Sequence, residues 1–283
     1  MLNRPWKVLT SNPVNRFHPL NRGRISWWLS IPPRAGGVRW YNLVGGGHGT
    51  VTGYYSVATW RGSSRPGGRS HLHFGGDTSA SYCDMPCAVT GPPLTVSFWF
   101  RASAISPYQT LFMSRDNGPS GVHISGATGN PLTAIWSSAE AEYDGSTGLT
   151  VSIGRWYFAC WVVKSTGWTL YLGDPSSGTL MSHTFTSSLG SRSITNWWAG
   201  MDSASRFWNG DMDDISIYNR AITWSEMKLL YDESWAGYPG TLRWLPSHVE
   251  ASISGDTGPA SVRPIIDGSL IGSPNLIRGV LVR

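Results

Sequence analysis

The stretch FWNGDMDDISIYNRAITWSEMKLLYDES, residues 207–234, decides the fold of this chain. Asp211, Asp213 and Asp214 crowd into its first half, and Glu226 follows after a gap. An acidic cluster of this kind is typical of a metal site, of a catalytic acid group or of a recurring local structure. Most functional predictions from this sequence depend on which of these three alternatives applies.

The second half of the stretch predicts a helix from about residue 224 to residue 233. Thr223-Trp-Ser-Glu226 is a capping box, in which the Thr223 hydroxyl accepts the backbone N–H of Glu226. The Glu226 carboxylate reaches back to the N–H of Thr223 in the same motif. This assigns Glu226 to the start of the helix rather than to a reaction.

The first half of the stretch predicts a strand with a bulge. Met212 and Ile215 are both expected to face the core, yet they are three positions apart, so strict alternation fails between them. A β-bulge at Asp213 and Asp214 explains the spacing. Bulges expose backbone carbonyls, whose oxygens can ligate a metal ion.

The rest of the chain predicts an all-β protein. Charged residues make up only 14% of the 283 residues, while 34 are glycine and 16 are tryptophan. Segments 94–102 (LTVSFWFRA) and 155–163 (RWYFACWVV) have strand patterns, the second apolar on both faces. Segments 168–174 and 183–188 then form a hairpin around Pro-Ser-Ser-Gly. Short strands separated by Gly-rich turns indicate a sandwich or jelly roll.

The run NGDMDDISIYNRAITWSEMKLLYDE resembles the closing strand and helix of laminin-G-like, concanavalin A-like jelly rolls. Earlier segments resemble the same family in the same order: ISWWLSIPPRAGGVRWYNLVGGGHGTVTG, HLHFGGDTSASY, LTVSFWFRA, and GRWYFACWVV followed by WTLYLGD. The resemblance covers residues 25–235. It implies an all-β, concanavalin A-like (laminin-G-like) jelly-roll sandwich with one short C-terminal helix and extended terminal arms.

Three zones follow from this pattern. Residues 1–24 lack periodicity and predict an extended arm, and residues 25–245 hold the jelly roll. Residues 246–283 are punctuated by Gly, Ser and Pro but contain several apolar pairs, which predicts short strands rather than a free tail.

The resemblance also implies a calcium site, because this family often carries a structural or ligand-bridging Ca²⁺. Asp213 and Asp214 match the family's Asp-Asp pair, and Asn42 in the Gly-rich opening loop and Asp77 are further candidate ligands. Ca²⁺ takes six to eight oxygen ligands, including backbone carbonyls. The alternative is that one of the two aspartates caps a turn by accepting backbone N–H groups.

Concanavalin-like folds also host glycoside hydrolases, and the retaining ones need two carboxyl groups about 5 Å apart. Glu140-Ala-Glu142-Tyr-Asp144 would place three carboxyl groups on one strand face. The order of residues does not match the family's catalytic run, and Asp144-Gly-Ser predicts a turn. We therefore expect a solvated acidic edge and no catalytic residues. His71 and His73 lack a third metal ligand and are expected on a polar strand face.

Exposed tryptophans are the candidate ligand-binding residues, because indole rings stack on sugars and partners. We select Trp197, Trp198 and Trp208. Trp197 and Trp198 are adjacent, and neighbouring rings on a strand cannot both face the same core.

Cysteine usage and the chain's start bear on its compartment. Cys83, Cys87 and Cys160 are an odd number at irregular spacing, so they predict partly buried thiols, with a small Cys83–Cys87 bridge as the alternative. The N-terminus lacks the apolar region of a Sec-type signal peptide, and no run of about 18 apolar residues occurs. We expect synthesis in the cytoplasm, no membrane insertion, and a final place on a virion or extracellular surface.

The functional prediction is a non-enzymatic surface binding and assembly module, most simply a capsid decoration or fibre-type protein of a virion. Its expected partners are other subunits of an assembly, either a homo-oligomer or capsid and tail proteins, bound through the terminal segments. Cell-surface glycans are further expected partners. Basic residues are scattered, so nucleic acid is not. The first alternative is a free or secreted glycan-binding lectin, and the second is a glycoside hydrolase.

Overall fold

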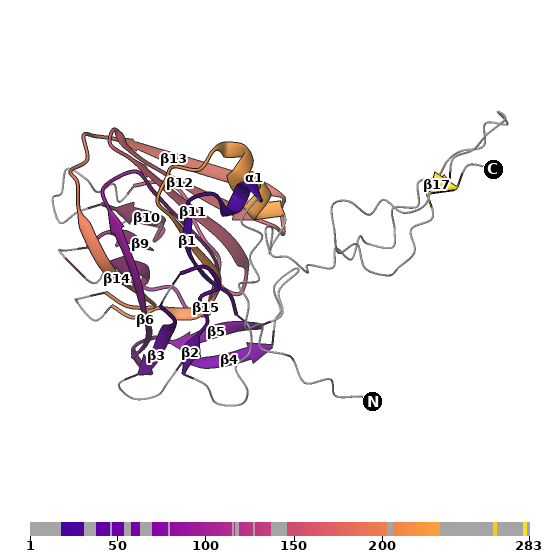
Figure 1. Cartoon of the computed structure of the whole chain (residues 1–283). Helices are drawn as coiled ribbons and strands as arrows, with labels where there is room; N and C mark the ends of the chain where they lie inside the picture. The colour runs from indigo at the N-terminus through magenta and orange to yellow at the C-terminus, as the bar shows by residue number, and fades with distance from the viewer. Residues whose placement is uncertain are drawn as a thin grey trace.

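The protein folds into a β-sandwich of two antiparallel sheets, as the computed structural model shows (Figure 1). The structure describes residues 18–30, 38–45, 47–53, 58–62, 70–78, 80–114, 116, 119–126, 128–136, 146–202, 206–232, 263–264 and 280–281. The predicted all-β sandwich with one short α-helix is confirmed.

Sheet A contains eight strands: β1 (Arg24–Trp28), β4 (Thr59–Gly62), β5 (Ser70–Gly75), β7 (Leu94–Ala102), β11 (Trp156–Lys164), β12 (Gly167–Asp174), β13 (Thr179–Thr186) and β15 (Asn209–Tyr218). Their order is β13–β12–β11–β7–β15–β5–β4, and β1 also pairs with β15. The strand predicted at 94–102 is β7, and the strand predicted at 155–163 is β11. The predicted hairpin is β12 with β13, but β13 spans residues 179–186 rather than 183–188.

Sheet B contains seven strands: β2 (Arg39–Trp40), β3 (Gly49–Gly53), β6 (Ser81–Thr90), β8 (Thr110–Ser114), β9 (Gly121–Ile124), β10 (Leu132–Ile135) and β14 (Ser193–Ala199). Their order is β10–β9–β8–β14–β6–β3–β2. Two short 3₁₀ helices, η1 (Pro19–Asn21) and η2 (Gly76–Thr78), and the helix α1 (Trp224–Asp232) complete the sandwich.

Of the predicted C-terminal tail, the structure describes two dipeptide strands, β16 (Arg263–Pro264) and β17 (Val280–Leu281). They pair with each other in antiparallel register. The remaining tail residues and residues 1–17 of the predicted arm lie outside the described residues.

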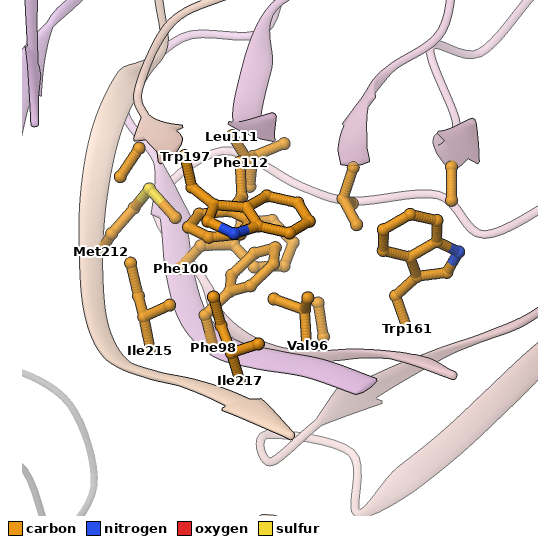
Figure 2. Packing of buried hydrophobic residues seen from close by; sticks show 14 of the residues in the cluster. Val96, Phe98, Phe100, Leu111, Phe112, Trp161, Trp197, Met212, Ile215 and Ile217 are labelled. Carbon is orange, nitrogen blue, oxygen red and sulfur yellow. The ribbon is translucent and has the colours of Figure 1, made fainter. Parts of the chain in front are cut away.

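The core lies between the two sheets and is built from alternate residues of each strand. Figure 2 shows Phe98 and Phe100 of β7, Phe112 of β8 and Trp197 of β14 packed together with apolar side chains of β15. The rings of Phe112 and Trp197 are stacked with their centroids 5.1 Å apart. Burial of large rings supplies most of the favourable free energy of such a sandwich.

The outer face of sheet A is covered by helices. Trp99, Phe158 and Tyr218 of the sheet pack against Met227 and Leu230 of α1. The same apolar cluster includes Leu20 of η1, which is fully buried. The sandwich therefore begins before residue 25, inside the segment predicted as an arm. The Leu20 side chain is buried against the apolar surface that sheet A shares with α1.

The predicted capping box at the start of α1 is confirmed. The Glu226 N–H donates to the Thr223 hydroxyl oxygen (3.3 Å), and the Thr223 N–H donates to a Glu226 carboxylate oxygen (2.8 Å). Arg220 donates to both carboxylate oxygens of Glu226, at 2.8 and 2.6 Å. Hydrogen bonds from Arg220 hold the pKa of Glu226 at about 2; burial opposes this shift, and Thr223 adds to it.

Glu226→Gln is expected to lower the free energy of unfolding at pH 7 by about 1 kcal/mol, the usual value of a helix cap. The folded-state pKa lies below the ordinary value of 4.5, so the carboxylate stabilises the fold above about pH 4.5 and its contribution is lost as pH falls toward 2. Denaturant unfolding at pH 7, 4.5 and 2.5 checks this, since the gap between wild type and variant should close on acidification. Asp232→Asn at the other end of α1 is the control, and a gap that persists at pH 2.5 contradicts the assignment.

The predicted bulge in β15 is confirmed. The register of β15 against β7 shifts between Asp213 and Ser216, and Asp214 has φ 54°, in the left-handed region. The extra residue lets Met212 and Ile215 both face the core, as the sequence requires.

Cysteines 83, 87 and 160 are free and buried, as the favoured prediction stated. Cys83 and Cys87 lie on the extended strand β6 with Met85 between them, and all three face the core. Burial raises the pKa of Cys87 to about 11, although a hydrogen bond with Ser26 opposes the shift.

Candidate functional site

Three of the four predicted calcium ligands lie around β1. The Asn42 carbonyl oxygen accepts the backbone N–H groups of Trp27, Val44 and Gly45 at 2.9–3.0 Å. One Asp214 oxygen accepts the indole N–H of Trp27 at 2.6 Å. These contacts organise the Gly-rich loop and anchor it to the bulge.

Asp213 is fully buried beside the same strand, and one of its oxygens accepts the backbone N–H of Ser30 at 3.3 Å. Asp77 lies apart from the other three, exposed in η2. Across the described ranges, no group of three or more His, Cys, Asp or Glu residues is arranged to hold a metal ion. Asp213 accepts a backbone N–H, as in the alternative to calcium binding, but from Ser30, which is distant in sequence, rather than from a turn. Calcium binding stays a prediction.

The three predicted ligand-binding tryptophans separate into two groups. Trp197 and Trp208 are fully buried in the core between the sheets, so neither ring can meet a ligand in this structure, which corrects that expectation. Trp198 points to the outer face of sheet B and is half-buried. Opposite orientation of Trp197 and Trp198 is what strand alternation predicts.

A row of side chains crosses the outer face of sheet B beside Trp198. Trp198 of β14 pairs with Asp84 of β6, Asp84 pairs with Thr50 of β3, and Thr50 pairs with Arg39 of β2. Directly paired residues point to the same face of a sheet. We call these four residues, together with Tyr82 of β6, the sheet B platform. With strands about 4.8 Å apart, the platform spans roughly 14 Å from Trp198 to Arg39.

An apolar layer supports the aromatic end of the platform. The rings of Tyr82 and Trp198 meet edge to face, with centroids 6.2 Å apart. Both rings pack against buried Met201 and Phe207, which fill the corner between β14 and β15. The Trp198 ring is therefore held in one orientation while part of its surface stays exposed.

A polar cluster borders the platform on the side of β8 and β9. The Thr110 hydroxyl donates to an Asp202 oxygen (3.0 Å), and the backbone N–H of Arg206 donates to the other Asp202 oxygen (3.1 Å). His123 is 7% exposed at this border. Its burial, assisted by the nearby Arg206 charge, lowers the pKa of His123 to about 4. His123 is therefore neutral at physiological pH.

The platform combines an apolar ring with hydrogen-bonding side chains. A partly exposed indole offers an apolar surface, while a carboxylate, a hydroxyl and a guanidinium offer hydrogen-bond partners. Trp198 provides the first, and Asp84, Thr50 and Arg39 provide the others. α1 covers sheet A, on the other side of the sandwich.

Sheet A carries a second cluster, centred on Asp211. One Asp211 oxygen lies 3.2 Å from His71 Nε2 and 2.8 Å from His73 Nδ1, and the other lies 2.6 Å from Arg101 Nη2. The Arg101 guanidinium and the His71 ring also contact the ring of Trp156. The carboxyl group is buried, with a side-chain exposure of 1%.

Burial alone raises the pKa of Asp211, but hydrogen bonds from His71 and His73, with the Arg101 ion pair, outweigh it and hold that pKa well below its usual range. His71 and His73 share one strand face, as predicted. Their carboxylate partner lies 138 or more positions along the chain, and the spacing of the histidines carries no signal of it.

Four residues of the platform are not predicted from the sequence: Tyr82, Asp84, Thr50 and Arg39. A signal for β6 was present in the alternation of Cys83, Met85, Cys87 and Val89. Pro86 interrupts this pattern, because proline is disfavoured inside a central strand. In the structure, Pro86 pairs with Asn196 next to a register shift in β14. Glu140, Glu142 and Asp144 lie outside the described residues.

The chain is similar to solved structures of sugar-active proteins. Domain 4 of AbnA, a GH43 extracellular arabinanase from Geobacillus stearothermophilus solved in complex with arabinotriose, matches with a TM-score of 0.55 and 18% identity over 74% of this chain and 98% of that domain. Trypanosoma rangeli sialidase matches with a TM-score of 0.50 and 14% identity. That match covers 74% of this chain and 32% of the sialidase, so the chain corresponds to about a third of that enzyme. At these identities the likeness shows the fold.

These neighbours correct one prediction. The absence of catalytic motifs suggested that the chain is not an enzyme, but the sandwich recurs in an arabinanase and in a sialidase. The prediction of no enzymatic activity is therefore contradicted.

No curated protein matches the sequence. Within the described part of the chain, no helix has the length and apolarity needed to span a bilayer. A family model described as the concanavalin A-like lectin/glucanases superfamily matches residues 74–228, from β5 into α1. The matched region contains most strands of both sheets and covers more than half of the chain. The chain therefore belongs to the concanavalin A-like lectin/glucanases superfamily.

Proposed function

We propose that the protein binds a carbohydrate chain on the sheet B platform. The observation that carries the proposal is the placement of Trp198, whose ring is partly exposed and packs against Tyr82, Met201 and Phe207. A ring held in this way can stack on a sugar with little loss of side-chain entropy. The arabinotriose bound to the similar domain of the arabinanase supports this class of ligand.

The direction of the bound chain follows from the register. Trp198, Asp84, Thr50 and Arg39 lie on four adjacent strands in one row, so the ligand crosses the strands rather than running along one of them. A span of roughly 14 Å suits an oligosaccharide better than a single sugar. Asp84 accepts hydrogen bonds from sugar hydroxyls, and Arg39 donates to their oxygens.

Trp198→Ala is expected to weaken binding by at least about 30-fold, corresponding to the 2 kcal/mol typical of a central aromatic contact. Isothermal titration calorimetry with arabino-oligosaccharides, and with a panel of glucans and sialylated glycans, measures this loss. Trp224→Ala is the matched control, because Trp224 is 52% exposed on α1, on the sheet A side of the sandwich. Equal effects of the two substitutions, or unchanged binding by Trp198→Ala, would place the site elsewhere.

Hydrolysis of the bound glycan is the second candidate function. Asp84 in the platform and Asp202 at its border are two acidic residues on the outer side of sheet B. Glycosidases work with a pair of carboxyl groups. Release of reducing ends by wild type, and its loss in both Asp84→Asn and Asp202→Asn by a larger factor than any loss of binding, supports hydrolysis. Binding without release of reducing ends supports recognition alone.

The proposed setting of this function is the surface of a particle or cell, reached without membrane insertion. The predicted virion role and the predicted subunit contacts involve residues 1–24 and 246–283, most of which lie outside the described residues. Both stay predictions. Carbohydrate binding by the platform does not depend on them.

A further inference from the structure

Arg206 is an exposed cation at the border of the sheet B platform, beside the aromatic end of that platform. It directly precedes Phe207, whose ring packs against Trp198. The Arg206 backbone N–H donates to Asp202, but the guanidinium Nε lies 3.9 Å from Asp202 Oδ2, which is beyond hydrogen-bond distance. The side chain of Arg206 is 48% exposed. The guanidinium therefore keeps N–H donors for a ligand.

A tyrosine ring supports this guanidinium. The Arg206 Cζ lies 5.0 Å from the centroid of the Tyr108 ring, within the range of a cation–π contact. The hydroxyl end of the Tyr108 ring lies over Gly126, where a Cβ atom would come within 2.2 Å of the ring carbon Cζ. The glycine thus lets the ring lie against the backbone, and the ring in turn holds Arg206 from one side.

The backbone of Tyr108 is unusual for a residue of its size. Its φ is 66°, in the left-handed region, where bulky side chains are rare. This conformation is unfavourable for a residue other than glycine, and strained residues of this kind cluster at ligand sites. Tyr108 is also 49% exposed, so burial alone does not account for its placement. A role in supporting Arg206 accounts for an exposed ring on a strained backbone.

We propose that Arg206, supported by Tyr108, binds the carboxylate of an acidic sugar next to the sugar that stacks on Trp198. The inference rests on the proposed function, because the sheet B platform holds the rest of the glycan. A guanidinium presents two parallel N–H donors, which match the two oxygens of a carboxylate.

The position of this subsite follows from the order of strands in sheet B. Asp202, which accepts the Arg206 backbone N–H, also contacts Thr110 of β8. β8 lies on one side of β14, and β6 lies on the other. The platform runs from Trp198 of β14 through β6 and β3 to Arg39 of β2. Arg206 therefore extends the platform beyond Trp198, in the direction away from Arg39.

The local charges suit a singly charged group. Burial and the charge of Arg206 lower the pKa of His123 to about 4, so His123 is neutral near pH 7 and Arg206 supplies the positive charge at this border. Asp202 lies close enough to balance part of that charge. One guanidinium in this setting matches a carboxylate better than a phosphate monoester, which carries a charge of about −1.5 to −2 at pH 7.

Matched pairs of ligands isolate the carboxylate. Isothermal titration calorimetry of the full chain compares an oligogalacturonate with its methyl ester, and sialyllactose with its methyl ester. The wild type is expected to bind the acid of at least one pair about tenfold or more tightly than the ester, because hydrogen bonds to charged groups are the stronger ones. Equal affinity for acid and ester in both pairs overturns the inference and leaves the proposed function standing. Binding of arabino-oligosaccharides with no binding of these four ligands does the same.

Substitution of the guanidinium locates the effect. Arg206→Gln is expected to lower the ratio of acid to ester affinity to about one, without changing the affinity for the ester. Arg155→Gln is the matched control, because Arg155 is 57% exposed and pairs with Asp174 at a similar distance, 3.8 Å, beside sheet A. Both variants remove one positive charge from the protein. An equal fall of the ratio in both variants contradicts the assignment to Arg206.

Tyr108 acts through Arg206 and is a positioning residue, so its test compares two replacements. Tyr108→Phe keeps the ring and should keep the ratio of acid to ester affinity. Tyr108→Asn removes the ring and should lower that ratio about threefold, the value of an exposed cation–π contact. Asparagine tolerates the left-handed region, so Tyr108→Asn is expected to have a Tm no lower than that of the wild type. A ratio that Tyr108→Asn leaves unchanged overturns the positioning role.

Discussion

Asp211→Asn is expected to lower the free energy of unfolding by about 3–5 kcal/mol, the cost of removing one partner from a buried ion pair. The asparagine has no charge to balance Arg101, which lies 2.6 Å from Asp211. It also cannot accept from all three donors that now share the two carboxylate oxygens. For a chain of this size the loss corresponds to a fall in Tm of roughly 6–20 °C.

The matched control is Asp232→Asn. Asp232 pairs with Lys228 on the exposed face of α1, and both side chains are nearly half-exposed. A surface pair at this spacing contributes about 0.5 kcal/mol or less. Denaturant unfolding of both variants at pH 7 gives the comparison. If Asp211→Asn costs no more than Asp232→Asn, the buried cluster does not stabilise the sandwich.

Trp197→Ala is the second large effect, with an expected loss of about 3–5 kcal/mol in the free energy of unfolding. The ring is fully buried, stacks on Phe112, and donates its indole N–H to the backbone carbonyl of Cys87 at 3.1 Å. Figure 2 shows that Phe100, Leu111 and Phe112 surround it, so truncation leaves a cavity and a buried carbonyl without its donor.

Trp198→Ala is the adjacent control. It removes a ring of the same size from the outer face of the same strand, where the surface can close with water, and we expect a loss of no more than about 1.5 kcal/mol. The two variants should therefore separate stability from binding: Trp197→Ala unfolds at lower denaturant, and Trp198→Ala folds but loses carbohydrate. Loss of binding by both variants with equal stability contradicts this division.

Local patterns in the sequence predict most of the fold. The nine residues of β7 were predicted with their bounds, because alternation is intact over their whole length. The capping box predicts α1 and assigns Glu226 to the start of the helix rather than to catalysis. The bulge in β15 followed from the three-residue spacing of Met212 and Ile215, which only an extra residue can explain.

The site depends on contacts that no local pattern contains. Alternation predicts that Trp197 and Trp198 face opposite ways, but it does not say which of them faces the core. In the structure, the Trp197 ring faces the core and stacks on Phe112 of another strand. Asp84 and Thr50 become neighbours of Trp198 only because β6 and β3 follow β14 in sheet B, an order that the chain's sequence of elements does not reveal. Asp211 meets His73 for the same reason, through pairing of β15 with β5.

The contact between η1 and α1 places the first and last elements of the sandwich on the same side of it. Leu20 and Met227 share one apolar cluster on the outer side of sheet A, so the chain enters and leaves the sandwich on that side. The platform lies on the opposite side, across the thickness of the core. Residues 18 and 232, the first and last described residues of the sandwich, therefore both lie on the side opposite the proposed binding platform.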